Sequence, residues 1–149
     1  MSVHKIDGVD GVNHFPKKFV TLYSVDTAVT AGDWMKIHPT DTTNGLGGSV
    51  TNAIATASDG LQSALIVGVS TETITAAGNI VIQIAGKYEN ANVTTGLTVG
   101  MALTVTNANA GRAVQYISST HTDTGPCGVL LEEAAANLGD VMIINQGFF

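Results

Sequence analysis

The chain has 149 residues, of which 44% are hydrophobic and 12% charged, and its formal net charge is −6 at pH 7. This length suffices for one domain whose core needs no disulfide or metal. No apolar run approaches the roughly 18 residues of a membrane-spanning helix, and the first residues lack the apolar segment of a secretory signal. We therefore expect a protein made in the cytoplasm that does not interact with membranes.

The composition predicts an all-β fold. Val, Ile and Thr recur in short runs separated by Gly, Asn and Asp, whereas most strong helix formers are scarce. In chain order, strands are expected over 19–25, 33–38, 64–70, 79–86, 101–107, 113–118, 127–132 and 140–147. Residues 39–52 are expected to form a loop, and 49–64 could be a short helix or an edge strand. Short strands at this spacing predict a compact small β-barrel or β-sandwich.

Two segments of the chain resemble each other. "GVSTETITAAGNIVIQIAG" (68–86) and "GVLLEEAAANLGDVMIINQG" (128–147) each contain Gly-Val, an Ala-rich bend, Gly-Asn or Gly-Asp, and an apolar run. Shorter relatives of this unit lie at 28–37 and 96–105. We interpret the unit as a repeated turn and strand, with a repeated binding site as the alternative. Gly78 and Gly139 are expected to supply the positive φ of each turn.

Residues with catalytic chemistry are sparse. Glu132 and Glu133 are adjacent, so on a strand they point to opposite faces and cannot act as an acid–base pair. The segment 118–123 contains serines, a histidine and an aspartate, but it does not resemble a nucleophile elbow. The single Cys127 is expected to be a buried apolar residue. No local metal-pair spacing occurs among the histidines, which are His4, His14, His38 and His121. We predict no enzyme activity, no catalytic residue, no cofactor and no metal site.

Charge divides the chain into an arm and a body. Residues 1–18 have a formal charge of about +1 and the remainder about −7. An acidic body repels phosphate backbones, so we expect no nucleic-acid partner. The arm lacks a helical period, and we expect it to be extended and to order on a partner, with a frayed terminus as the alternative. Phe148 and Phe149 at the other end favour docking onto a neighbouring subunit.

Several of these segments resemble a known family. The quoted pieces are "TAGDWMKI" (30–37), "CGVLLEEAAANLGDVMIINQG" (127–147) and a diverged internal copy, "VGVSTETITAAGNIVIQIAG" (67–86). An Ala-Gly-Asp turn before a strand, a Gly-Val-Leu-x-Glu-Ala strand and a closing Gly-Asp-Val strand are typical of the small head-decoration, or capsid cement, proteins of tailed bacteriophages. The resemblance extends over most of 19–147.

The resemblance implies a structural virion protein. Such a protein forms a homotrimer on the outer surface of the capsid, clamps neighbouring major capsid proteins and stabilises the shell. Residues 1–18 would then be the tether and 19–149 the β-rich decoration domain. The subunit interface would include Trp34, Phe148 and Phe149. The capsid-binding residues of the arm would be Val3, Lys5, Ile6, Val9, Val12, Phe15, Lys17 and Lys18.

Two other function classes remain open on the sequence. A carbohydrate-binding or fibre-tip β-sandwich module is suggested by Trp34, Tyr88 and Tyr116, because aromatic rings stack on sugars. Trp34 would then be an exposed platform rather than a core or interface residue. A small β-barrel enzyme is the third class, and it rests only on the scattered histidines and acids.

Overall fold

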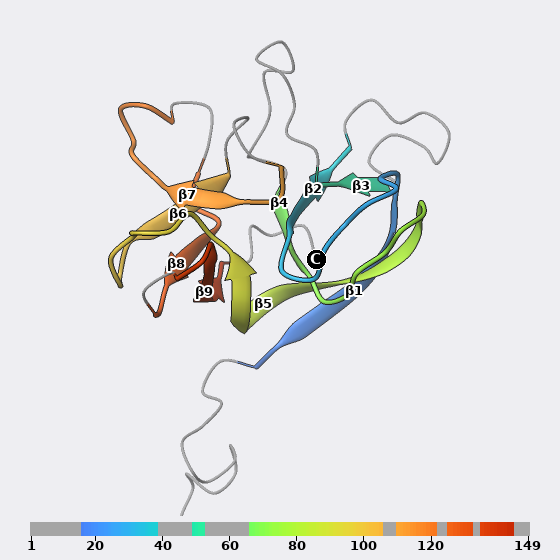
Figure 1. The fold of residues 1–149 in the computed structure, drawn as a ribbon, viewed down its shortest axis with the longest axis horizontal. Coiled ribbons are helices and arrows are strands. Elements are labelled where there is room, and N and C mark those ends of the chain that lie inside the picture. The colour runs from blue at the N-terminus through green and yellow to red at the C-terminus, as the bar shows by residue number, and fades with distance from the viewer. Residues whose placement is uncertain are drawn as a thin grey trace, which may run out of the picture.

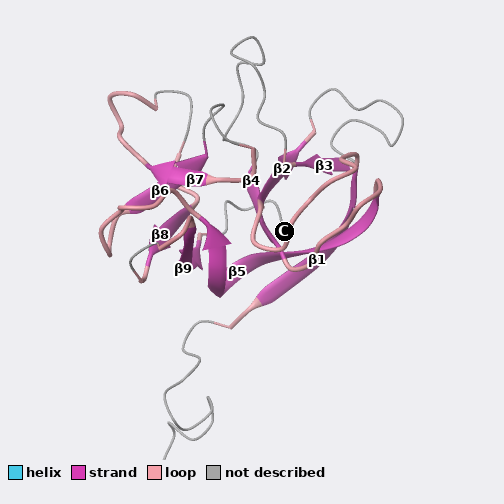
Figure 2. Cartoon of the chain, in the orientation of Figure 1, coloured by secondary structure: helices cyan, strands magenta, loops and turns pink. Residues whose placement is uncertain are grey.

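The computed structural model describes residues 16–38, 49–52, 66–105, 110–121, 125–132 and 135–144. Within these ranges the secondary structure is nine strands without a helix (Figure 2). Nothing in the described part of the chain is a helix that could cross a membrane. The strands are β1 (Lys18–Ser24), β2 (Trp34–Ile37), β3 (Ser49–Thr51), β4 (Ile66–Ser70), β5 (Gly78–Asn92), β6 (Ala102–Val105), β7 (Ala113–Gln115), β8 (Gly128–Leu130) and β9 (Leu138–Ile143).

The first half of the chain forms a closed barrel of five strands, seen on the right of Figure 1. The strands follow the order β1-β3-β2-β4-β5, and β1 pairs with β5 to close the circle. All of these pairings are antiparallel except that of β1 with β3, where Tyr23 lies opposite Ser49. Closure leaves few open strand edges, which are a route to aggregation.

The second half forms a second ring of five strands on the left of Figure 1. Its order is β5-β9-β8-β6-β7, and a parallel bridge from Val93, directly after β5, to Ala113 of β7 closes it. Strand β5 therefore belongs to both barrels. Its first part pairs with β1 and β4, and its second part, from Gly86 onward, pairs with β9.

The two sequence copies correspond to equivalent parts of the two barrels. In the first barrel the N–H of Gly32 donates to the carbonyl of Ser70 (2.9 Å), and the N–H of Ser70 donates to the carbonyl of Asp33 (2.8 Å). The same pair of bonds occurs in the second barrel, at 2.8 and 2.9 Å, between Gly100, Leu130 and Met101. The repeat is thus one β-module used twice, as the architectural interpretation predicted.

Close contact with the adjacent strand explains why each Gly-Val pair begins with glycine. A Cβ at Gly68 would collide with the backbone carbonyl of Gln83 on β5. A Cβ at Gly128 would lie 2.9 Å from the carbonyl oxygen of Met142 on β9. Gln83 and Met142 are equivalent positions, since each lies opposite the valine that follows the glycine. The adjoining strand therefore approaches too closely for any side chain at either glycine.

The expectation for Gly78 and Gly139 is wrong. Neither residue has a positive φ, because Gly78 opens β5 and Gly139 lies within β9, where the backbone is extended. The reversal before β9 is made instead by Ala136 and Asn137, whose φ angles are 52° and 63°. Two successive left-handed residues are typical of a tight hairpin turn, and asparagine tolerates this region.

Each of the eight predicted strands overlaps an observed one, and the all-β class is confirmed. Strand β3 lies where the segment expected to be a loop (39–52) overlaps the undecided segment 49–64, for which an edge strand was one of the two alternatives. The sequence prediction ended β5 at Gly86, whereas the strand continues to Asn92. Gly86 has a φ of 90°, so it bends the strand instead of ending it. The arm as far as residue 15 and residues 53–64 of the undecided segment lie outside the described residues.

Candidate functional site: the junction of the two barrels

Trp34 joins the two barrels. It comes from β2 of the first barrel, yet its side chain is 2% exposed and belongs to the core cluster of the second barrel. A Cβ at Gly128, inside that barrel, would lie 2.9 Å from Cη2 of Trp34, so the indole occupies the space that this glycine leaves. The backbone N–H of Trp34 donates to the carbonyl of Gly111 (2.8 Å) before β7.

This placement corrects two readings of Trp34. A side chain that is almost fully buried within its own chain has no surface with which to form a subunit interface. For the same reason it is not an exposed platform for a sugar ring. The indole is a core residue whose burial connects two modules of one chain.

A buried carboxylate lies beside the tryptophan. Asp33 is 7% exposed, and its carboxylate accepts hydrogen bonds from the N–H of Thr30 (3.0 Å) and from Nδ2 of Asn52 (2.9 Å) and Asn92 (3.0 Å). Asn92 ends β5, and its Oδ1 accepts a bond from Nε of Arg112 (3.0 Å). A buried carboxylate is stable only when its oxygens are satisfied in this way. The network ties both barrels to the turn before β2.

Gly111 completes the junction. Its N–H donates to the carbonyl of Asn52 (2.9 Å), and a Cβ there would lie 2.7 Å from Cγ of Asp33. Glycine allows the β6–β7 connection to approach the carboxylate closely. With its oxygens bonded to backbone and side-chain amides, Asp33 has a structural role in this arrangement.

We expect Asp33→Ala to lower the free energy of unfolding by about 3 kcal/mol, because it leaves several buried donors without an acceptor. Asp33→Asn should cost nearly as much, since its amide would direct N–H groups at the amides of Asn52 or Asn92. Urea denaturation followed by circular dichroism measures both values. Glu89→Gln is the control for charge removal on the surface, and we expect a change within about 0.5 kcal/mol. An equal, small effect of all three substitutions would contradict this role.

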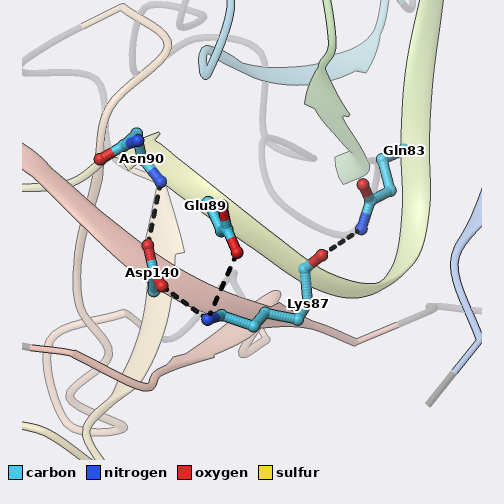
Figure 3. Close-up of polar contacts among 5 residues, drawn as sticks. All are labelled: Gln83, Lys87, Glu89, Asn90 and Asp140. Carbon is cyan, nitrogen blue, oxygen red and sulfur yellow. Dashed lines mark hydrogen bonds and ion pairs between the residues drawn. The ribbon is translucent and has the colours of Figure 1, made fainter. Parts of the chain in front are cut away.

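The bend of β5 is held by a buried glutamine. Gln83 is 2% exposed, and its Nε2 donates to the carbonyl of Ala85 (3.1 Å), before Gly86, and to that of Lys87 (2.9 Å), after it. Figure 3 shows the bond to Lys87. A Cβ at Gly86 would lie 3.1 Å from Cα of Lys17, so the bend is in close contact with the residues that lead into β1. The N-terminal segment therefore enters the body at the point where the two barrels share a strand.

An ion pair lies just beyond this bend (Figure 3). Nζ of Lys87 is 2.7 Å from Oδ2 of Asp140 and 3.7 Å from Oε1 of Glu89, and the N–H of Asn90 donates to Oδ1 of Asp140 (3.2 Å). Partial burial alone would raise the pKa of Asp140, but the hydrogen bonds from Lys87 and Asn90 and the lysine charge outweigh it and hold this pKa below its ordinary value. The hydrogen bond to Asp140 raises the pKa of Lys87.

These directions fix the pH dependence of the pair. Because the pKa of Asp140 is lowered in the folded chain, its ionised carboxylate stabilises the fold above about pH 4. This stabilisation is lost as the pH falls through the folded-state pKa. Because the pKa of Lys87 is raised in the folded chain, its charged amine stabilises the fold below about pH 10. This stabilisation is lost as the pH rises through the folded-state pKa. We expect Lys87→Gln to be less stable than the wild type at pH 7, with a difference that shrinks below pH 4. Urea midpoints at pH 7 and pH 3 measure this, and a constant difference would contradict it.

The other predicted site residues lie apart from this junction. Lys17 and Lys18 are exposed at the start of β1. The hydroxyl of Tyr88 donates to the carbonyl of Ser70 (2.8 Å), and Tyr116 stacks on His121 with ring centroids 6.0 Å apart. Outside the described residues are Val3, Lys5, Ile6, Val9, Val12, Phe15, Phe148 and Phe149.

Cys127 belongs to the core cluster of the second barrel. Cys127 is buried, as expected, and burial raises the pKa of its thiol. No group of three or more His, Cys, Asp or Glu side chains that could hold a metal ion occurs among the described residues.

Sequence reasoning missed the Asp33 network. The only local signal was the Ala-Gly-Asp turn that precedes β2. Its partners Asn52 and Asn92 are 19 and 59 residues away in the chain, and no pattern in a single sequence pairs them with Asp33.

The fold defines an all-β protein in which two five-stranded barrels share one long strand. No protein-family model and no curated protein matches the sequence. Among solved structures, the crystal structure of the head fiber gp8.5 N base in bacteriophage phi29 is similar, with a TM-score of 0.55 and 15% sequence identity. The match covers 87% of this chain and 95% of that chain. At this identity the likeness is one of fold.

Proposed function

We propose that this chain is a structural protein of a bacteriophage head that attaches to the outer surface of the capsid. The observation that supports this most is the fold, which is similar over nearly the whole chain to the base of a head fiber. The resemblance of the repeated segments to head-decoration proteins leads to the same class. In this proposal the chain forms a homotrimer, binds the major capsid protein through residues 1–18 and stabilises the shell.

The position of the arm supports such an attachment. Residues 16 and 17 lie against Gly86, where β5 passes from one barrel to the other, so a pull on the arm acts on the strand common to both barrels. The exposed Lys17 and Lys18 give this point of the acidic chain a local positive charge. A trimer would present three such arms, and after one binds the other two act at high effective concentration.

Cosedimentation tests the attachment. The purified protein is mixed with mature heads of the phage whose genome encodes it, made without this protein, and we expect binding that saturates at a fixed number of copies per head. Lys17→Gln combined with Lys18→Gln should weaken binding by about tenfold at low salt, as expected for the loss of two surface ion pairs.

The matched control is Ser118→Glu combined with Ser119→Glu, which changes the net charge by the same amount on an exposed turn. We expect this variant to bind as the wild type does. If the wild-type protein does not cosediment with the heads, the proposed function is wrong. If both variants lose binding equally, only net charge matters and the arm has no special role.

The carbohydrate-binding alternative loses its main motivation. The tryptophan that suggested it is in the core, and the described tyrosines Tyr88 and Tyr116 already have partners within the chain. No observation in the described residues favours a second function.

A further inference from the structure

Part of the outer face of the second barrel is apolar. Ala102 of β6, Val129 of β8 and Met142 of β9 lie side by side in register and point away from the barrel interior. All three are partly exposed. Outward positions of a barrel in water are ordinarily polar, and a row of three apolar side chains across adjacent strands is typical of a contact surface.

The equivalent face of the first barrel is covered within the chain. There the same three positions are Trp34, Val69 and Gln83, which lie in register on β2, β4 and β5. Their exposed fractions are 2%, 0% and 2%. Trp34 and Val69 belong to the core cluster of the second barrel. In the first module this face is thus the surface on which the next module packs.

The second barrel also has exposed apolar residues at one end. Val99, Leu131 and Leu138 are 54%, 38% and 44% exposed. The turn that contains Val99 is hydrogen-bonded to Leu130, the neighbour of Leu131. By strand pairing, with Gln83 equivalent to Met142, the equivalent positions of the first barrel are Ala31, Thr71 and Asn79. Small or polar residues at these positions are therefore compatible with the fold. The fold alone does not explain the large apolar residues of the second barrel.

We propose that a second copy of this chain packs on the outer face of the second barrel, defined here as Ala102, Val129, Met142, Val99, Leu131 and Leu138. Within one chain this face of the module is covered by another module of the same kind, so a second copy is the occupant for which the chain provides a precedent. Lys87, opposite Met142, is already paired with Asp140 within the chain, and the exposed Glu132 follows Leu131, so charged groups border the apolar residues. The inference rests on the proposed self-association and is independent of attachment to a shell.

Light scattering after size exclusion tests the proposal with the full chain. We expect the wild type, with a subunit mass of 15.3 kDa, to elute as an oligomer. Val129→Lys should raise the dissociation constant of the oligomer by about a hundredfold, because it buries an unpaired charge in the contact. Val129 is partly exposed within one chain, so the lysine has access to water in the monomer, and circular dichroism checks that the barrel is intact.

A matched pair of turn variants separates the face from general effects of charge. Val99 and Ala31 are the second residues of equivalent turns, each closed by a hydrogen bond between flanking residues and each followed by a glycine of positive φ. We expect Val99→Lys to weaken the oligomer by about tenfold and Ala31→Lys to leave it unchanged.

Thiol labelling gives a second readout. Cys127 is buried and its thiol pKa is raised, so an introduced surface cysteine is the reactive one. Leu138→Cys should react with a maleimide about tenfold more slowly in concentrated than in dilute protein, whereas Asn79→Cys should react equally in both.

Each outcome bears on one claim. The proposed contact face is supported if Val129→Lys dissociates the oligomer and the cysteine of Leu138→Cys is protected from maleimide in concentrated protein. An intact oligomer in the Val129→Lys and Val99→Lys variants overturns the face and leaves the head-binding function standing. A wild-type chain that is monomeric at all concentrations overturns the self-association, while the cosedimentation experiment decides shell attachment separately.

Discussion

Trp34→Ala is expected to lower the free energy of unfolding by about 3 to 5 kcal/mol, the usual cost of removing a large buried aromatic side chain. The indole lies in the core of the second barrel although its backbone belongs to the first, so its removal leaves a cavity where the two modules meet. Urea denaturation monitored by circular dichroism measures the loss. Typical domains are stable by about 5 to 15 kcal/mol, so this loss removes a large share of the stability and should lower the midpoint of thermal unfolding.

Two further variants sharpen this result. Trp34→Phe retains part of the buried surface, and we expect a loss of about half that of the alanine variant. Tyr116→Ala removes an aromatic ring that stacks on His121 and is only partly buried, and it should cost about 1 kcal/mol or less. If Trp34→Ala costs no more than Tyr116→Ala, the indole does not join the barrels.

Gly68→Ala should be comparably severe, with a loss of about 3 kcal/mol or more. The added methyl group would collide with the backbone carbonyl of Gln83 on β5, and backbone cannot rotate away as a flexible side chain can. Relief requires the separation of β4 from β5, which are adjacent strands of the closed first barrel. Thermal and urea unfolding measure the effect.

The control is Gly125→Ala. Nothing lies within 4 Å of a Cβ built at Gly125, and its φ is not positive. We expect a change within about 0.5 kcal/mol, or a slight gain because alanine restricts the unfolded chain. Gly128→Ala should also be destabilising, because its Cβ would press on Met142 and Trp34. Equal effects at Gly68 and Gly125 would show that the steric argument is wrong.

The shared strand explains why a chain of this size holds two barrels. Each ring has five strands, and the 15-residue β5 contributes to both, so neither barrel closes without residues of β5. Gln83 and Gly86 hold its bend, and Trp34 and Asp33 link the modules across it. We therefore expect the described body to unfold cooperatively and not barrel by barrel.

The sequence by itself determined the local part of this protein. Alternating β-branched residues between Gly, Asn and Asp placed eight of the nine strands, because this periodicity and these turn formers act over a few residues. The repeat of 68–86 in 128–147 indicated that one unit is used twice. Burial of Cys127 followed from its apolar character and the lack of a second cysteine.

Only the tertiary structure decided how the units are joined. Trp34 could be a core, interface or sugar-binding residue until its position in the second barrel was known, because burial depends on chain segments distant in sequence. Asp33 finds Asn52 and Asn92 only after both barrels close. The continuation of β5 past Gly86 depends on pairing with β9, since a glycine can end a strand or bend it. Closure, the shared strand and the buried carboxylate are long-range contacts, and no local pattern encodes them.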